Sequence, residues 1–351
     1  MSCGAAAAFP SNPPMPFNTE QVRQLLLQLG AYVRERLITV RQAASGQPSS
    51  LSAVSRESVA DTIYEIDRVS EEAIESWFSQ HWPAELPVEL VMEGIEPGLP
   101  VTIPVGIPVE RTICKCSLDP IDGTRGIMYD KRSAWFLGGV APQKGPATRL
   151  TDILVAAMVE LPTTRQWRSD SVSAIRGQGV VSESMNLFTG EIKPLTLRPS
   201  RATDVLHGFA YISRFFPVGK ALTATVEERL WNSLGLTSVG KENVIFEDQY
   251  ISTSGQFYEI LSGHDRMIAD IRPLVFQALG VESALCCHPY DVSAILVLTE
   301  WGIPVEKPLG GLLDSPLDTT SPVAWVAFAN HDLADRIRPA FQQVLKEVLA
   351  P

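Results

Sequence analysis

The chain has 351 residues, of which 45% are hydrophobic and 20% charged, and its formal net charge is −11. This length and composition suit one large two-lobed domain or two ordinary domains, with disorder expected only at the ends. The negative charge argues against a nucleic-acid polymer or an anionic membrane as a partner. No apolar stretch reaches the roughly 18 residues that a membrane span requires.

The N-terminus and the cysteines favour a cytoplasmic setting. Residues 1–17 are rich in Ala and Pro and lack a basic segment, so we expect a flexible lead-in rather than a signal peptide. The five cysteines have no zinc-finger spacing, and their odd number does not suggest a disulfide framework.

Hydrophobic periodicity predicts two regions with different patterns of helices and strands along the chain. Up to about residue 202 we expect an α+β lobe (18–202), with helices at 18–44 and 68–82 and strands at 88–92, 111–117, 134–140, 153–160 and 173–175. From residue 203 onward we expect an α/β lobe (203–351), with helices at 221–234, 291–301 and 332–349 and strands at 209–212, 268–271 and 325–329. The alternation of helices and short apolar strands is typical of α/β proteins.

The sharpest local signal is the string Asp-Pro-Ile-Asp-Gly-Thr at 119–124, which we place directly after an apolar strand ending at Leu118. Two carboxylates three residues apart, Asp119 and Asp122, can share or bridge hard divalent ions such as Mg²⁺. Gly123 allows the backbone to approach a ligand closely, and the amides of Gly123 and Thr124 can face an anion if a helix starts there. The alternative for such a string is a turn that only reverses the chain.

This string resembles the signature of the inositol monophosphatase family of Mg²⁺-dependent, lithium-sensitive phosphatases. The family includes inositol, fructose bisphosphate and phosphoadenosine nucleotide phosphatases. Weaker matches follow in the right order from about residue 20 to residue 345. The resemblance implies a layered αβαβα sandwich of the sugar phosphatase type. Its first lobe would hold an antiparallel sheet with two long helices, its second a mostly parallel sheet, and the site would lie between them. Homodimers are common in the family, although the sequence identifies no interface.

Two further carboxylates are similar to family positions upstream of the signature. Asp67 takes the place of a carboxylate that orients a water, although Tyr64 stands where the family has threonine. A simple helix cap is the alternative role for Asp67. Glu93 matches the first member of a Glu-Glu pair whose second member is Gly94 here, and Glu96 is a rival for its role.

Downstream, residues 288–294 resemble the family's Trp-Asp-x-Ala-Ala-Gly motif. Asp291 matches the carboxylate of that motif, and we expect it at the N-terminus of a helix. Tyr290 replaces the Trp, and Ile295 stands where the Gly is expected.

The resemblance implies a site with two or three Mg²⁺ ions and a water that attacks phosphorus. The implied metal ligands are Glu93, Asp119, the carbonyl of Ile121, Asp122 and Asp291, and Asp67 would help to hold an additional ion. The implied catalytic residues are Thr124 and Asp67, which orient or deprotonate the water, and Glu93, which holds the activating ion. Gly123 and Thr124 would also contact the phosphate.

The implied function is a Mg²⁺-dependent phosphomonoesterase that acts on a small phosphorylated metabolite. Residues 254–263 and 269–273 resemble the phosphoadenosine branch somewhat more than the inositol branch, which makes Ser254 and Arg272 candidate substrate contacts. A structural ion pair is the alternative role for Arg272. Phosphoadenosine nucleotide and fructose bisphosphate phosphatases are alternative functions. A catalytically silent protein that binds a phosphorylated ligand is another, because the motifs depart from the family at the four positions named above.

Overall fold

The computed structural model describes residues 16–43, 54–57, 62–96, 98–237, 244–282 and 285–349, and the side chains of all of these except 43, 54–57 and 62–72. Almost all of the expected lead-in, residues 1–17, lies outside this part. Among the described residues, no helix combines the length and apolarity that a membrane crossing needs.

The larger of two main sheets has eight strands in the order β10-β9-β8-β7-β6-β5-β3-β4. They are β3 (Val88–Met92), β4 (Val101–Ile103), β5 (Cys114–Asp122), β6 (Ala134–Pro142), β7 (Val155–Leu161), β8 (Arg168–Ile175), β9 (Gly179–Asn186) and β10 (Ile192–Pro194). All neighbours are antiparallel except β3 and β5. The expected antiparallel sheet is therefore present, and β4, β9 and β10 are additional strands that we did not predict.

Strand β5 differs from the prediction at both ends. The segment 109–111 is a short 3₁₀ helix, and the strand continues past Leu118 to Asp122. Its pairing with β6 shifts register between Asp119 and Asp122. Pro120 has no N–H to donate to a ladder, which suits an irregularity at this point. The two carboxylates are thus buried on the strand itself rather than in a loop after it.

The outer face of this sheet is covered by α1 (Thr19–Ala43) and α2 (Glu65–His81), close to the predicted helices. A short antiparallel pair, β1 (Val54–Glu57) and β2 (Thr62–Tyr64), precedes α2. Helix α1 lies close to the sheet at Gly30. A Cβ placed there would be 2.5 Å from Cγ2 of Val159 and 2.7 Å from the ring of Phe136.

Gly30→Ala is therefore expected to destabilise the protein, by roughly 1–2 kcal/mol. The overpacking against β6 and β7 outweighs the better helix propensity of alanine. The midpoint of thermal unfolding measures the effect. Gln28→Ala, on the exposed side of the same helix, is the matched control and should leave the midpoint nearly unchanged. If the thermal unfolding midpoint of Gly30→Ala were equal to or higher than that of Gln28→Ala, the close approach of α1 to the sheet would be contradicted.

The smaller sheet has the order β11-β12-β14-β13 and contains β11 (Phe209–Ile212), β12 (Asp265–Asp270), β13 (Val305–Glu306) and β14 (Trp325–Phe328). The expectation of a mostly parallel sheet is wrong, since only β11 and β12 are parallel. Helices α4 (Lys220–Ser233) and α5 (Thr253–Ser262) lie between β11 and β12 in the chain, as parallel neighbours require. No helix lies between β13 and β14, and that pair is antiparallel.

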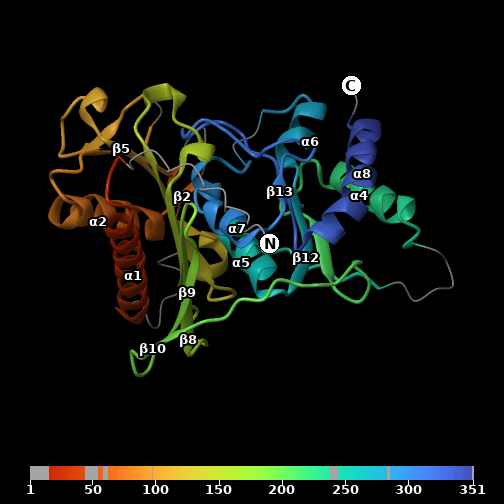
Figure 1. Cartoon of the computed structure of the whole chain (residues 1–351), viewed down its shortest axis with the longest axis horizontal. Coiled ribbons are helices and arrows are strands. Elements are labelled where there is room, and N and C mark those ends of the chain that lie inside the picture. Colours follow the sequence, from red (N-terminus) through yellow and green to blue (C-terminus); the bar gives the residue numbers. More distant parts are fainter. Residues whose placement is uncertain are drawn as a thin grey trace, which may run out of the picture.

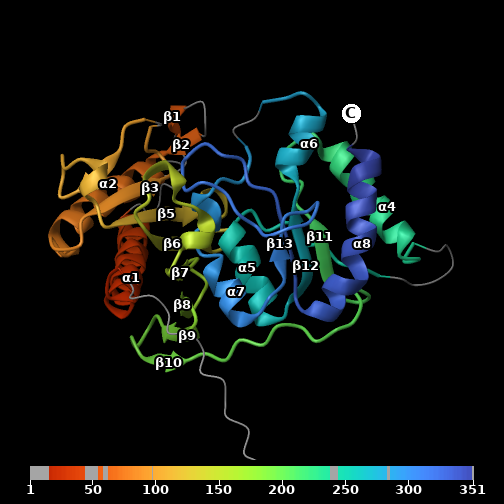
Figure 2. The same cartoon turned by 45° about the horizontal axis from the view of Figure 1, so that its top comes forward.

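The elements stack in five layers (Figures 1 and 2). From one side these are α1 with α2, the larger sheet, α5 with α7 (Leu296–Trp301), the smaller sheet, and α4 with α8 (His331–Val348). Helix α6 (Arg272–Ala278) lies near α4. Three buried clusters of apolar side chains fill the spaces between successive layers. The expected αβαβα sandwich is confirmed.

Candidate metal centre

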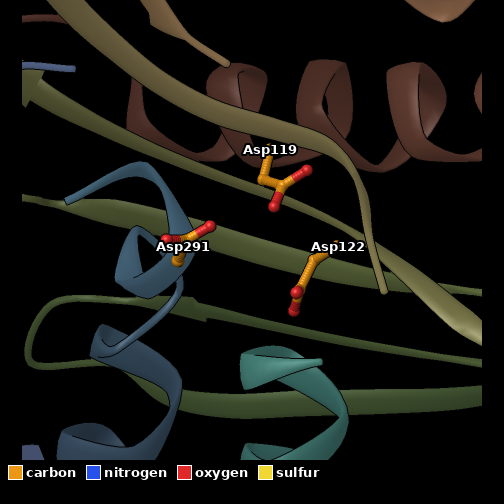
Figure 3. A group of neighbouring side chains, drawn as sticks. All are labelled: Asp119, Asp122 and Asp291. Carbon is orange, nitrogen blue, oxygen red and sulfur yellow. The ribbon is translucent and has the colours of Figure 1, made fainter. Parts of the chain in front are cut away.

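Three carboxylates meet beside the middle layer. Asp119 and Asp122 come from β5, and Asp291 comes from a 3₁₀ turn, Tyr290–Val292, that precedes α7. One oxygen from each of the three lies within 4.8 Å of the others. Figure 3 shows the three side chains around a common space. The structure thus brings together three of the predicted metal ligands from two distant parts of the chain.

Asp122 is held by the start of α5. Its Oδ2 accepts hydrogen bonds from the hydroxyl of Ser252 (3.0 Å), the amide of Ser254 (2.6 Å) and the hydroxyl of Ser254 (2.5 Å). Ser252 is also the N-cap of α5, where its hydroxyl accepts from the amide of Gly255. Burial raises the pKa of Asp122, while these hydrogen bonds favour the ionised form and oppose the rise.

The end of β5 forms a compact turn around the other signature residues. The amide of Ile121 donates to Oδ1 of Asp119 (3.0 Å), and the hydroxyl of Thr124 donates to the carbonyl of Ile121 (2.9 Å). Gly123 has a φ of +99° and caps α3 (Thr124–Met128). A Cβ there would be 3.0 Å from Cβ of Ser252 and 3.1 Å from a backbone oxygen, so only glycine suits this position.

Asp291 reaches β5 because its turn packs directly on the larger sheet. A Cβ at Gly139 of β6 would be only 2.3 Å from the carbonyl oxygen of Ser293, so glycine permits this approach. Oδ2 of Asp291 accepts from the amide of His288 (2.6 Å). The prediction that Asp291 opens an α-helix is wrong, because α7 begins only at Leu296. The turn at Tyr290–Val292 is instead a separate 3₁₀ segment.

The carboxylates upstream of the signature occupy different places in the fold. Glu93 follows β3, is half-buried and lines the same cleft as the three aspartates. Glu96 is exposed and lines a different cavity. Asp67 lies in the first turn of α2, but its side chain is outside the described residues.

Arg272 lines the cleft, yet its guanidinium is paired. Nε lies 2.9 and 3.0 Å from the carboxylate oxygens of Asp270, and Nη1 donates to the carbonyl of Leu285 (2.8 Å). Although burial opposes it, the charge of Asp270 raises the pKa of Arg272. The guanidinium also lies 5.2 and 5.6 Å from the ring centres of Phe215 and Phe216. This geometry favours the structural ion pair that we kept as the alternative.

Some cleft residues were not identified from the sequence. Ser252, Phe215, Phe216 and Arg125 all line it, whereas Ser254, a predicted substrate contact, is fully buried and faces Asp122. The pattern Ser-Thr-Ser-Gly before an apolar run is a helix start signal that could have drawn attention to Ser252. No comparable signal marks the two phenylalanines.

The donor set fits a hard divalent cation. The cleft has a volume of about 90 Å³ and is lined by four carboxylates, those of Glu93, Asp119, Asp122 and Asp291. Mg²⁺ prefers oxygen ligands. The crowding of buried carboxylates is unfavourable unless positive charge is present, which a bound cation provides.

Comparisons with known proteins support the fold. No family model matches the sequence, and no curated protein matches it. Among solved structures, the extragenic suppressor protein SuhB from Bartonella henselae matches with a TM-score of 0.61 and 17% identity, over 93% of this chain and 99% of that chain. Fructose-1,6-bisphosphatase from Leishmania major in its holo form matches with a TM-score of 0.64 and 14% identity, over 95% and 96% of the two chains. An inositol monophosphatase from Zymomonas mobilis matches with a TM-score of 0.53 and 14% identity, over 92% of this chain and 98% of that chain.

The chain therefore has the fold of the sugar phosphatases. It is the fold of the solved structures described as inositol monophosphatase and fructose-1,6-bisphosphatase, which agrees with the fold that the resemblance in the signature implied.

Proposed function

We propose that the chain is a Mg²⁺-dependent phosphomonoesterase that releases phosphate from a small phosphorylated metabolite. The observation that carries the proposal is the meeting of Asp119, Asp122 and Asp291 within 4.8 Å. The likeness to structures described as fructose-1,6-bisphosphatase and inositol monophosphatase supports it. Lithium sensitivity and a cytoplasmic location stay predictions.

The carboxylates are the ligands in this proposal. Mg²⁺ held by Glu93, Asp119, the carbonyl of Ile121, Asp122 and Asp291 would supply positive charge to the phosphate and lower the pKa of the attacking water. Ser252 and Ser254 orient Asp122 through their hydrogen bonds to its Oδ2. They are positioning residues, which replaces the substrate contact that we predicted for Ser254.

Thr124 and Asp67 handle the water in this proposal. The proton of the Thr124 hydroxyl points to the carbonyl of Ile121, which orients the oxygen as an acceptor toward a water. Helix α2, which carries Asp67, packs near α3, which begins at Thr124. The amides at Gly123 and Thr124 would bind the phosphate oxygens.

A substrate panel tests the function. Phosphate release is measured with inositol monophosphate, fructose bisphosphate and phosphoadenosine phosphate, each with Mg²⁺ and after chelation. Mg²⁺-dependent release from at least one phosphate monoester is expected, and the ester that releases phosphate fastest would select among the alternative substrates. Absence of release from a broad panel, combined with an intact rise in melting temperature on adding Mg²⁺, would favour the catalytically silent ligand-binding protein instead.

Ser254→Ala is expected to weaken Mg²⁺ binding by roughly 10- to 100-fold, because Asp122 loses a hydroxyl donor and its fixed orientation. A titration of melting temperature against Mg²⁺ measures the change. Ser262→Ala, in the last turn of the same helix, serves as the control, because its hydroxyl contacts two helix carbonyls and Nδ1 of His264, none of which lines the cleft. Equal Mg²⁺ dependence in the two variants would argue against the positioning role.

A further inference from the structure

The carboxylate cleft is small, with a volume of about 90 Å³, and its lining is dominated by the four carboxylates and the end of β5. These groups suit a phosphate group and its cations. They offer little apolar surface for the alcohol portion of a substrate, which we expect to contact a neighbouring surface.

A much larger cavity adjoins the cleft. It has a volume of about 850 Å³, within the range of small-molecule sites, and Cys286 and His288 line both spaces. His288 is buried and also donates its amide to Asp291. The wall that separates the two spaces is thus directly connected to the metal centre.

The walls of this cavity are mainly apolar. Phe276 of α6 forms one side, and Leu309, Leu313 and Val323 from the segments around β13 and before β14 form the other. Among its polar neighbours, Asp314 is already engaged by the side chains of Arg149 and Thr151.

Among the remaining described polar side chains of the lining, Gln277, Glu282, Lys307 and Thr320 are exposed to solvent, and Ser315 and His288 are buried. A polyol would need several hydrogen-bonding groups along the walls, because its buried hydroxyls must be satisfied. These walls suit a hydrocarbon or ring system better.

We propose that this cavity binds the alcohol portion of the substrate, and that the substrate is a phosphate monoester of a bulky, mainly apolar alcohol rather than of a polyol. The inference rests on the proposed phosphatase function. The phosphate lies in the carboxylate cleft, and the apolar group passes Cys286 and His288 into the cavity between α6 and the segment 307–315.

Binding of non-hydrolysable phosphonates tests the cavity without requiring turnover. In the presence of Mg²⁺, calorimetry compares 2-(1-naphthyl)ethylphosphonate with ethylphosphonate on the whole protein. The naphthyl compound is expected to bind at least tenfold more tightly, because its ring system is removed from water. It should also compete with inorganic phosphate. Equal affinity for the two compounds would overturn the proposal. So would binding of the naphthyl compound that does not compete with inorganic phosphate, because such a compound would occupy a separate site.

Two leucines in one loop provide matched variants. Leu309 lines the cavity and is 48% exposed, whereas Leu312 is 69% exposed and does not line it. Leu309→Asn is expected to weaken naphthylethylphosphonate binding three- to tenfold and to leave ethylphosphonate binding unchanged, while Leu312→Asn changes neither. Because both leucines are partly exposed and both variants are neutral, folding and net charge are matched. If the affinity ratio between the naphthyl compound and ethylphosphonate were the same in Leu309→Asn as in the unaltered protein, the assignment would be contradicted.

Turnover measurements distinguish a failure of the cavity assignment from a failure of the proposed phosphatase function. The phosphate esters 2-(1-naphthyl)ethyl phosphate and ethyl phosphate have similar primary-alcohol leaving groups, so a difference between them reports binding. A KM at least tenfold lower for the naphthyl ester supports the inference. Release from both esters with equal KM overturns it and leaves the phosphatase function standing. Selective, competitive phosphonate binding without release from either ester supports the cavity assignment and overturns the proposed hydrolysis.

Discussion

Asp119→Asn is expected to lower Mg²⁺-dependent phosphate release by about a thousandfold and to abolish the rise in melting temperature caused by Mg²⁺. A metal ion contributes several kcal/mol to transition-state stabilisation, and about 4 kcal/mol corresponds to a factor of a thousand. The amide keeps the size of the side chain but removes the charge from one of the three clustered carboxylates. Initial rates on the best ester of the panel and a Mg²⁺ titration of melting temperature give the two measurements.

The control for this prediction is Asp332→Asn, the same chemical change in the exposed first turn of α8. It should leave both the rate and the Mg²⁺ effect unchanged. If Asp119→Asn retained the rate and the Mg²⁺ effect, the cluster would not be the metal centre.

Arg272→Met is expected to destabilise the protein by about 3–5 kcal/mol, because it leaves the carboxylate of Asp270 buried without its partner. The side chain of Asp270 is only 1% exposed, and that of Arg272 is 13% exposed. Denaturation by urea measures the loss of stability.

The double variant Asp270→Asn/Arg272→Met distinguishes a structural from a substrate-binding arginine. Removing both charges should restore much of the stability, since no unpaired buried charge remains. If Arg272→Met instead left stability unchanged and raised only the KM for phosphate esters, the arginine would be a substrate contact.

Much of the fold could be predicted because its elements carry strong local signals. Helices α1, α4 and α8 were placed within one or two residues from their apolar periodicity. Strands β9 and β10 were missed because they are largely half-buried or exposed and carry no apolar run. What fixes β9 is its continuous pairing with β8, which is a long-range property. Local patterns do not contain such information.

The candidate site was only partly predictable for a similar reason. Asp119 and Asp122 stand out in the sequence, but their meeting with Asp291 depends on the packing of a turn against Gly139. The family resemblance supplied that residue where the pattern alone could not. The pairing of Arg272 with Asp270 was also invisible, because residue spacing does not determine where a long side chain points. The predicted roles of Asp67, Glu93 and Ile121 stay predictions.

The attachment of Asp122 to the start of α5 has a consequence for the order of folding. During synthesis β5 emerges long before α5 and the turn that carries Asp291. Until those segments arrive, Asp122 lacks both its serine donors and its neighbouring carboxylate. A cation that needs all of them would bind only the completed, layered chain and would stabilise that state by mass action. Bound Mg²⁺ would then favour the last step of assembly over every earlier intermediate, and fragments ending before Asp291 would gain nothing from it.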